Sequence, residues 1–134
     1  MNKLIKPLFL SCILYANVSY ADVFNFKITQ QNFYCKPKQK CDVYADYDVF
    51  VVNETNKTQH YTLLYSLELI TPISSYTAGE SFDIAPHDTF KKHYHHIWRD
   101  FMLEDSNSYL LKSNIAIFGQ PETNKEMTTT VWVY

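Results

Sequence analysis

Apolar and mostly polar residues alternate along much of the chain, which is the pattern of a β-strand with one buried face. Apolar side chains occupy every second position from Val43 to Val51, and the same period recurs from Tyr61 to Leu69. Successive side chains of a strand point to opposite faces, so each segment predicts a strand with one face in the core. The polar residues 53–57 between them predict a turn, and the two segments together predict a hairpin.

Shorter segments on either side continue the β pattern. A first strand starts at Phe24 and is expected to continue past an irregularity at Gln30 and Gln31 toward Cys35. Residues 89–98, 109–117 and 127–134 read as further strands, with a short strand around Phe82 and Ile84. The non-strand expectations are an irregular crossing at 72–79, a Pro86-His87-Asp88 turn, a helical turn at 100–107 and a turn at 119–125.

About seven short strands without a long helical period predict an all-β protein, folded as one antiparallel β-sandwich of roughly 100 residues. Three stretches also resemble bacterial immunoglobulin-like or fibronectin III-like modules: residues 49–55, residues 84–89 with their proline turn, and residues 109–119 followed by 128–133. The resemblance implies an immunoglobulin-like architecture and no particular function. The chain departs from the pattern at His87, where such modules carry glycine after the turn proline.

The first 21 residues predict export. Lys3 and Lys6 precede an apolar run at residues 8–16, and Ser19-Tyr20-Ala21 places small residues before a cleavage point at Asp22. The expected organisation is a signal peptide at 1–21 and a single domain at 22–134, secreted or periplasmic. The apolar run is too short to span a bilayer, and no other stretch is long enough, so no stable membrane span is expected. A lipoprotein signal ending at Cys12 is a less favoured alternative.

Cys35 and Cys41 are the two cysteines of the expected mature chain, and two cysteines in an oxidising compartment predict one disulfide. A metal pair or a redox pair is less favoured, because redox motifs have two intervening residues and a zinc site needs two further ligands. Because only five residues separate the two cysteines, we expect that their disulfide does not bridge two sheets.

Composition excludes several classes of function. The full chain carries a formal net charge of −2, and loss of Lys3 and Lys6 makes the mature protein more acidic, which argues against nucleic acid and anionic membranes as partners. There is no Gly-x-Ser-x-Gly elbow, no His-Glu-x-x-His motif and no phosphate-binding glycine loop, and the chain has only 2 glycines. We therefore expect neither an enzyme nor a cofactor.

Aromatic residues are unusually frequent, with 11 tyrosines and 9 phenylalanines in 134 residues. A single core of this size does not accommodate them all, and exposed rings favour contacts with protein or carbohydrate. Candidate binding residues are Trp132, Tyr134, Tyr44 and Phe50, with strand addition at the last strand if that strand forms a sheet edge. The leading hypothesis is an exported, non-catalytic β-sandwich that binds another macromolecule, either protein or glycan.

Two alternatives remain open. Alternation places His93 and His95 on one face of a strand, where both imidazoles can reach one metal ion, with His60, His87 or an acidic residue as a further ligand. On this alternative the chain is a periplasmic metal-binding protein. The alternation of Trp132 and Tyr134 up to the chain end is also compatible with a small outer-membrane β-barrel.

Overall fold

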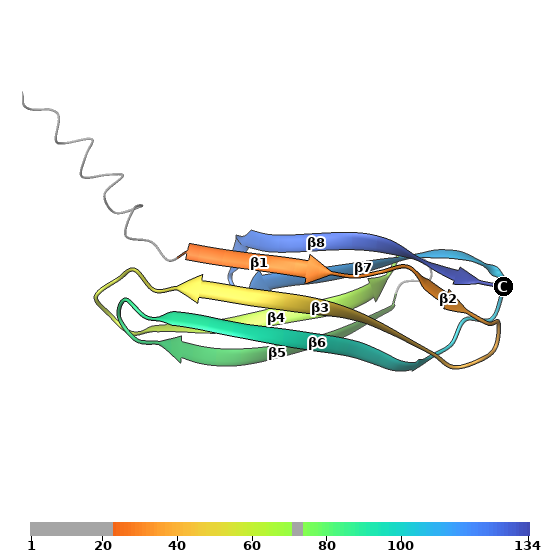
Figure 1. Ribbon diagram of the computed structural model, residues 1–134, viewed down its shortest axis with the longest axis horizontal. Coiled ribbons are helices and arrows are strands. Elements are labelled where there is room, and N and C mark those ends of the chain that lie inside the picture. The colour runs from red at the N-terminus through yellow and green to blue at the C-terminus, as the bar shows by residue number, and fades with distance from the viewer. Residues whose placement is uncertain (1–22, 71–73) are drawn as a thin grey trace, which may run out of the picture.

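The computed structural model describes residues 23–70 and 74–134, which form eight β-strands arranged in two sheets (Figure 1). The strands are β1 (Val23–Thr29), β2 (Phe33–Cys35), β3 (Cys41–Val52), β4 (Gln59–Leu69), β5 (Ser74–Ile84), β6 (Thr89–Phe101), β7 (Asn107–Ile117) and β8 (Gln120–Val133). The expected signal peptide and part of the expected crossing after β4 lie outside the described residues. The all-β prediction is confirmed, with one strand more than the expected seven.

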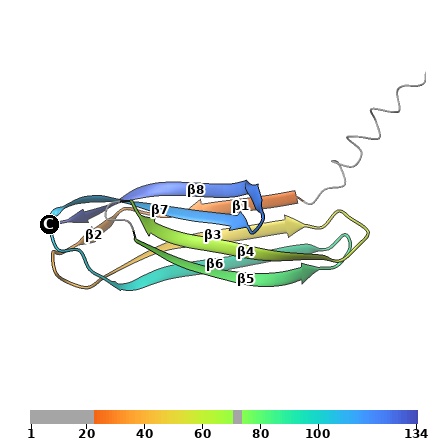
Figure 2. The ribbon, with the colours of Figure 1, turned by 180° about the vertical axis from the view of Figure 1, so that it is seen from behind.

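The two sheets pack face to face as a sandwich, seen from both sides in Figures 1 and 2. The three-stranded sheet has the order β1-β3-β6, and the five-stranded sheet has the order β2-β8-β7-β4-β5. If β1, β3, β4, β6, β7 and β8 are taken as strands A, B, C, E, F and G, one sheet contains A-B-E and the other G-F-C, as in an immunoglobulin fold. The immunoglobulin-like sandwich is therefore confirmed by its strand order.

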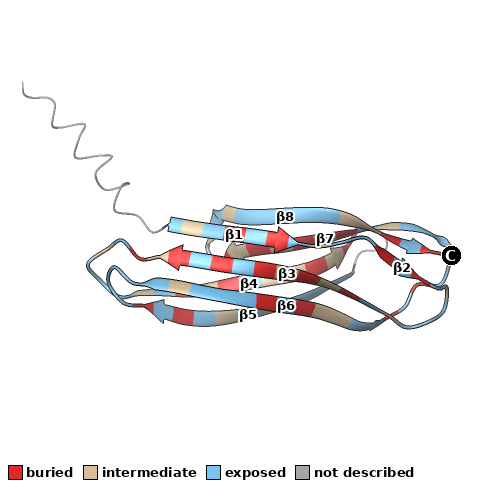
Figure 3. Ribbon diagram, viewed as in Figure 1, coloured by how far each residue is buried: buried red, intermediate tan, exposed pale blue. Residues whose placement is uncertain are grey.

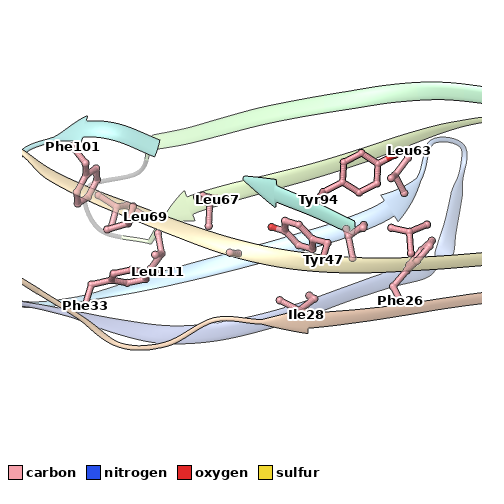
Figure 4. Packing of buried hydrophobic residues seen from close by; sticks show 14 of the residues in the cluster. Phe26, Ile28, Phe33, Tyr47, Leu63, Leu67, Leu69, Tyr94, Phe101 and Leu111 are labelled. Atoms are coloured by element: carbon pink, nitrogen blue, oxygen red, sulfur yellow. The ribbon is translucent and has the colours of Figure 1, made fainter. Parts of the chain in front are cut away.

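The alternating residues of β3 and β4 face the space between the sheets and form the centre of the core. Val43, Ala45, Tyr47, Val49 and Val51 are all buried, and the burial alternates along β3 in Figure 3. Figure 4 shows Tyr47 from the three-stranded sheet pointing between the sheets toward the strands of the other sheet, where its hydroxyl donates to Ser66 O at 2.9 Å. This bond satisfies the one polar atom of a large buried ring.

The predicted hairpin of β3 and β4 is wrong, although both strands are correct. β3 pairs with β1 and β6, whereas β4 pairs with β5 and β7, so the connection at residues 53–58 crosses from one sheet to the other. Local alternation identifies a strand and its buried face, but a polar loop between two strands serves equally well for a hairpin and for a crossing between sheets.

The expected irregularity at Gln30 and Gln31 is a change of sheet. β1 ends at Thr29 in the three-stranded sheet, and β2 starts at Phe33 in the five-stranded sheet, where it pairs in parallel with β8. The sandwich is consequently not purely antiparallel. The Gln30 side chain, at the point of change, donates to Leu111 O at 3.0 Å and contacts Thr129 Oγ1.

Three smaller expectations are corrected. Residues 102–106 contain no helical turn, the turn between the last two strands is confined to residues 118–119, and β8 starts at Gln120. Gly79 lies inside β5 rather than in an irregular crossing, and glycine is needed there because a Cβ would approach Leu63 O to 2.7 Å. The Pro86 turn is confirmed: Asp88 N donates to Ala85 O at 3.0 Å, and His87 takes the left-handed conformation (φ 59°) that favours glycine.

Candidate functional site

The Cys35–Cys41 disulfide is present and lies at the end of the sandwich that also holds the C-terminus (Figure 1). The Cα atoms are 5.8 Å apart. Cys35 belongs to β2 and Cys41 to β3, so the bond joins the last residue of a strand in one sheet to the first residue of a strand in the other. The expectation that these cysteines are too close in sequence to connect two sheets is wrong, because the chain itself crosses between the sheets there.

Near this end, large apolar side chains share the outer face of the five-stranded sheet. Trp132 of β8 is 43% exposed and lies beside Tyr34 of β2, which is 65% exposed. Tyr134 is 64% exposed and meets Tyr34 edge to face, with ring centroids 6.3 Å apart. Each faces outward because its chain neighbours Phe33, Cys35, Val131 and Val133 are buried in the core.

Two aliphatic side chains extend this group across the sheet. Leu110 of β7 pairs with Thr130, which lies two residues before Trp132 on the same face of β8, and half of Leu110 is exposed. Ile70 follows β4, is exposed, and donates its backbone N–H to Leu110 O at 3.2 Å. We call Tyr34, Ile70, Leu110, Trp132 and Tyr134 the aromatic patch.

The patch is not built on a free strand edge. At Trp132, β8 pairs with Ser108 of β7 on one side and with Tyr34 of β2 on the other. The condition for strand addition at the end of the chain is therefore not met there. What this part of β8 offers is the outward surface of its side chains, with Lys36 Nζ 5.5 Å from the centre of the Tyr134 ring.

Tyr44 and Phe50, the other two predicted binding residues, lie on the opposite outer face of the molecule. Both belong to β3 at positions that alternate with its buried residues. Tyr44 is half-buried: its ring meets Phe33 edge to face at 5.0 Å and lies 5.0 Å from the His95 ring. Phe50 is 38% exposed. The structure thus separates the four candidates into two sites.

The four predicted metal-ligand histidines are also separated. His60 Nδ1 lies 2.6 Å from Asp83 Oδ1, and His87 Nε2 lies 2.8 Å from Asn56 Oδ1. His93 and His95 share a face of β6, as predicted, but they are held by the acidic residues of β3. Within the described residues, no three His, Cys, Asp or Glu side chains form a group that is arranged to hold a metal ion.

His93 bridges two carboxylates. Its Nδ1 lies 2.7 Å from Asp48 Oδ1 and its Nε2 lies 3.0 Å from Asp46 Oδ1, while His95 Nδ1 lies 2.9 Å from the same Asp46 oxygen. A carboxylate only accepts, so this geometry favours the form of His93 in which both ring nitrogens carry a proton. The hydrogen bond to Asp48, with a smaller contribution from Asp46, raises the pKa of His93.

Three buried polar residues, Asn53, His96 and Ser113, were not identified from the sequence. His96 faces inward between the sheets, where its Nε2 donates to Tyr76 O at 2.9 Å and its ring stacks on Tyr76 at 4.7 Å. Burial lowers the pKa of His96. Asn53, read as the start of a polar turn, is fully buried. The sequence signal for His96 is the alternation of faces along β6, because His96 follows Tyr94 by two residues and so lies on the same buried face.

No known family model matches this sequence, and no curated protein matches it in sequence. Among solved structures, the chain is similar to the ASH or PapD-like domain of human CEP192 (PapD-like domain 7), with 9% sequence identity and a TM-score of 0.37, over 81% of this chain and 82% of that chain. The described residues contain no helix with the length and apolar character that a membrane span requires.

Proposed function

We propose that this protein is an exported, non-catalytic binding module that contacts a partner protein through the aromatic patch. The observation that carries the proposal is the grouping of Tyr34, Trp132 and Tyr134 with Leu110 on one outer face. Rings and aliphatic side chains exposed together are unfavourable in water, whereas scattered ones are ordinary. Aromatic residues are enriched in protein–protein contacts because they offer a large contact area at a small entropic cost.

The composition of the patch favours a protein over a glycan as the partner. A glycan presents many hydroxyl groups, and each loses water on binding unless a polar partner replaces it. The side chains of Leu110 and Ile70 offer no hydrogen bond, so within the patch only the hydroxyls of Tyr34 and Tyr134 and the indole N–H of Trp132 can replace that water. An apolar centre with Lys36 at its border suits a protein surface that has an apolar centre of its own.

The test uses the mature protein and the native secreted and periplasmic fractions. An intact mass that starts at Asp22 checks the proposed export. Amine-reactive cross-linking with mass spectrometry is expected to join Lys36 to one partner protein, because Lys36 borders the patch. Trp132→Ala combined with Tyr34→Ala should abolish that cross-link, while circular dichroism and melting temperature stay close to wild type because both side chains are exposed.

Two control variants separate the patch from general surface effects. Phe118→Ala removes a ring that is 71% exposed, in the turn at the other end of β7 and β8. His93→Ala with His95→Ala alters the opposite outer face. Both should keep the cross-link. Retention of the cross-linked partner by the Trp132/Tyr34 variant refutes the proposal. If no protein is cross-linked but the wild-type protein binds a glycan array and the variant does not, the partner is a glycan instead of a protein.

A further inference from the structure

A hollow on the outer face of the three-stranded sheet surrounds Phe50. Strand register places Asn25, Phe50 and Lys91 in one row across β1, β3 and β6. The next row is Lys27, Asp48 and His93. These six residues line the hollow together with Val49 and Lys92, and the exposed ring of Phe50 forms its apolar part.

The hollow contains more basic side chains than its single carboxylate, that of Asp48, can neutralise. Asp48 is already held by His93 at 2.7 Å. Lys27 and Lys91 have no ion pair among the described residues, in contrast to Lys92, whose Nζ lies 2.9 Å from Glu80 Oε1. The hollow thus contains an exposed ring and two lysines without an ion pair among the described residues, in a protein that is acidic as a whole.

We propose that this hollow binds a carboxylate attached to an apolar ring or chain. The ammonium groups of Lys27 and Lys91 contact the carboxylate, and Phe50 contacts the apolar part. An ammonium–carboxylate contact is a charge-assisted hydrogen bond, which is stronger than a neutral one. The ring adds the burial of apolar area and an edge or stacking contact. The site is separate from the aromatic patch, since it lies on the other sheet and the opposite outer face.

The experiment titrates the mature protein with benzoate and follows backbone amide signals by NMR. Benzyl alcohol and acetate are the matched probes, because one keeps the ring without the charge and the other keeps the charge without the ring. We expect benzoate to shift the amides of residues in the two rows, and to bind more tightly than either probe. Its affinity should fall as salt is raised, because exposed charges are screened.

Variants assign the contacts. Lys27→Gln with Lys91→Gln should weaken benzoate binding about tenfold, which corresponds to about 1.4 kcal/mol, and leave benzyl alcohol unaffected. Phe50→Ala should weaken both ring-containing probes. The control Lys36→Gln with Lys38→Gln removes two charges from the disulfide loop, and Trp132→Ala removes the ring of the aromatic patch; both should bind benzoate as wild type does.

Three results overturn the proposal: equal affinity for benzoate and benzyl alcohol, benzoate shifts spread over several basic regions, or unchanged benzoate affinity in the Lys27/Lys91 variant. A capped phenylalanyl-aspartate peptide, titrated in parallel, distinguishes the source of the carboxylate. Tighter binding of the peptide supports an acidic protein segment as the natural ligand, and tighter binding of benzoate supports a free organic acid.

Discussion

Asn53 holds together three segments at the end of the sandwich opposite the disulfide. Its Nδ2 donates to Lys57 O at 2.7 Å, to Ile84 O at 2.9 Å and to Ala85 O at 3.1 Å. Its Oδ1 accepts from the backbone and the hydroxyl of Thr55 at 2.9 and 2.6 Å. Since β3 runs from Cys41 to Val52, the disulfide ties its first residue to one strand of the other sheet, and Asn53 ties its far end to β5.

Asn53→Ala should therefore lower the free energy of unfolding by on the order of 3 kcal/mol, because it leaves buried carbonyl groups without a donor. Urea denaturation monitored by tryptophan fluorescence measures the loss. Asn56→Ala is the matched control: Asn56 is exposed and its side chain forms a hydrogen bond with the exposed His87 ring, so its loss should cost less than about 0.5 kcal/mol. Equal losses in the two variants would show that the buried network does not carry this stability.

At the scale of one element, β4 shows how strongly a strand separates its two faces. It lies between β5 and β7, with Leu63 and Leu67 fully buried in the core. Glu68, the next residue, points to the outer face, where its Oε1 lies 3.5 Å from Lys112 Nζ of β7. A single position along the chain thus changes the environment from apolar core to a partly exposed ion pair.

Leu67→Asp should unfold the domain, because an unpaired carboxylate in the core costs several kcal/mol against a total stability of roughly 5 to 15 kcal/mol. Glu68→Gln removes one charge of a partly exposed pair and should cost less than about 1 kcal/mol. Thermal melting followed by circular dichroism compares the two variants. A folded Leu67→Asp protein with a melting temperature near that of Glu68→Gln would contradict the assignment of the buried face.

At the scale of the whole molecule, side chains close the gap between the edge strands β5 and β6, which belong to different sheets. Phe82 stacks on Phe90 with ring centroids 3.8 Å apart. Farther along, His96 stacks on Tyr76 and donates to its carbonyl. Between these two stacks lie Glu80, Lys92 and Tyr94. The Lys92 hydrogen bond lowers the pKa of Glu80, whose carboxylate also accepts from the Tyr94 hydroxyl at 3.0 Å.

His96 makes this contact between the sheets sensitive to acid. Because burial lowers the pKa of His96, the unfolded chain takes up a proton at a higher pH than the folded protein does. The stability that neutral His96 contributes is therefore complete above the unfolded pKa of about 6.5 and is lost as the pH falls through and below that value. His96→Gln keeps a donor for Tyr76 O without titrating.

Wild-type stability should accordingly fall relative to His96→Gln between pH 7.5 and pH 5, measured as the difference between their unfolding free energies in urea at each pH. His87→Gln, at an exposed turn, is the comparison variant and should follow wild type over the same range. A difference between wild type and His96→Gln that stays constant with pH would refute the titration of His96 as the cause.

The strands, their buried faces and two residues of the aromatic patch, Trp132 and Tyr134, follow from the sequence. The alternation of a strand is set by local backbone geometry, so Val43 to Val51 and Tyr61 to Leu69 are readable without knowing any partner. The same alternation predicts that Trp132 points away from the core. It does not predict that Leu110 and Tyr34 flank Trp132, because that depends on the order of strands in the sheet.

Tertiary structure alone decided the pairing and the connections. The residues 53–58 connect two sheets rather than a hairpin, and β1 and β2 separate at Gln30 and Gln31, although nothing in the local pattern distinguishes these outcomes. Strand partners are selected by which combination of faces buries the most apolar area with all backbone groups paired, and this is a property of the whole chain. The disulfide between the sheets, the burial of Asn53 and the separation of Phe50 from Trp132 all result from that selection.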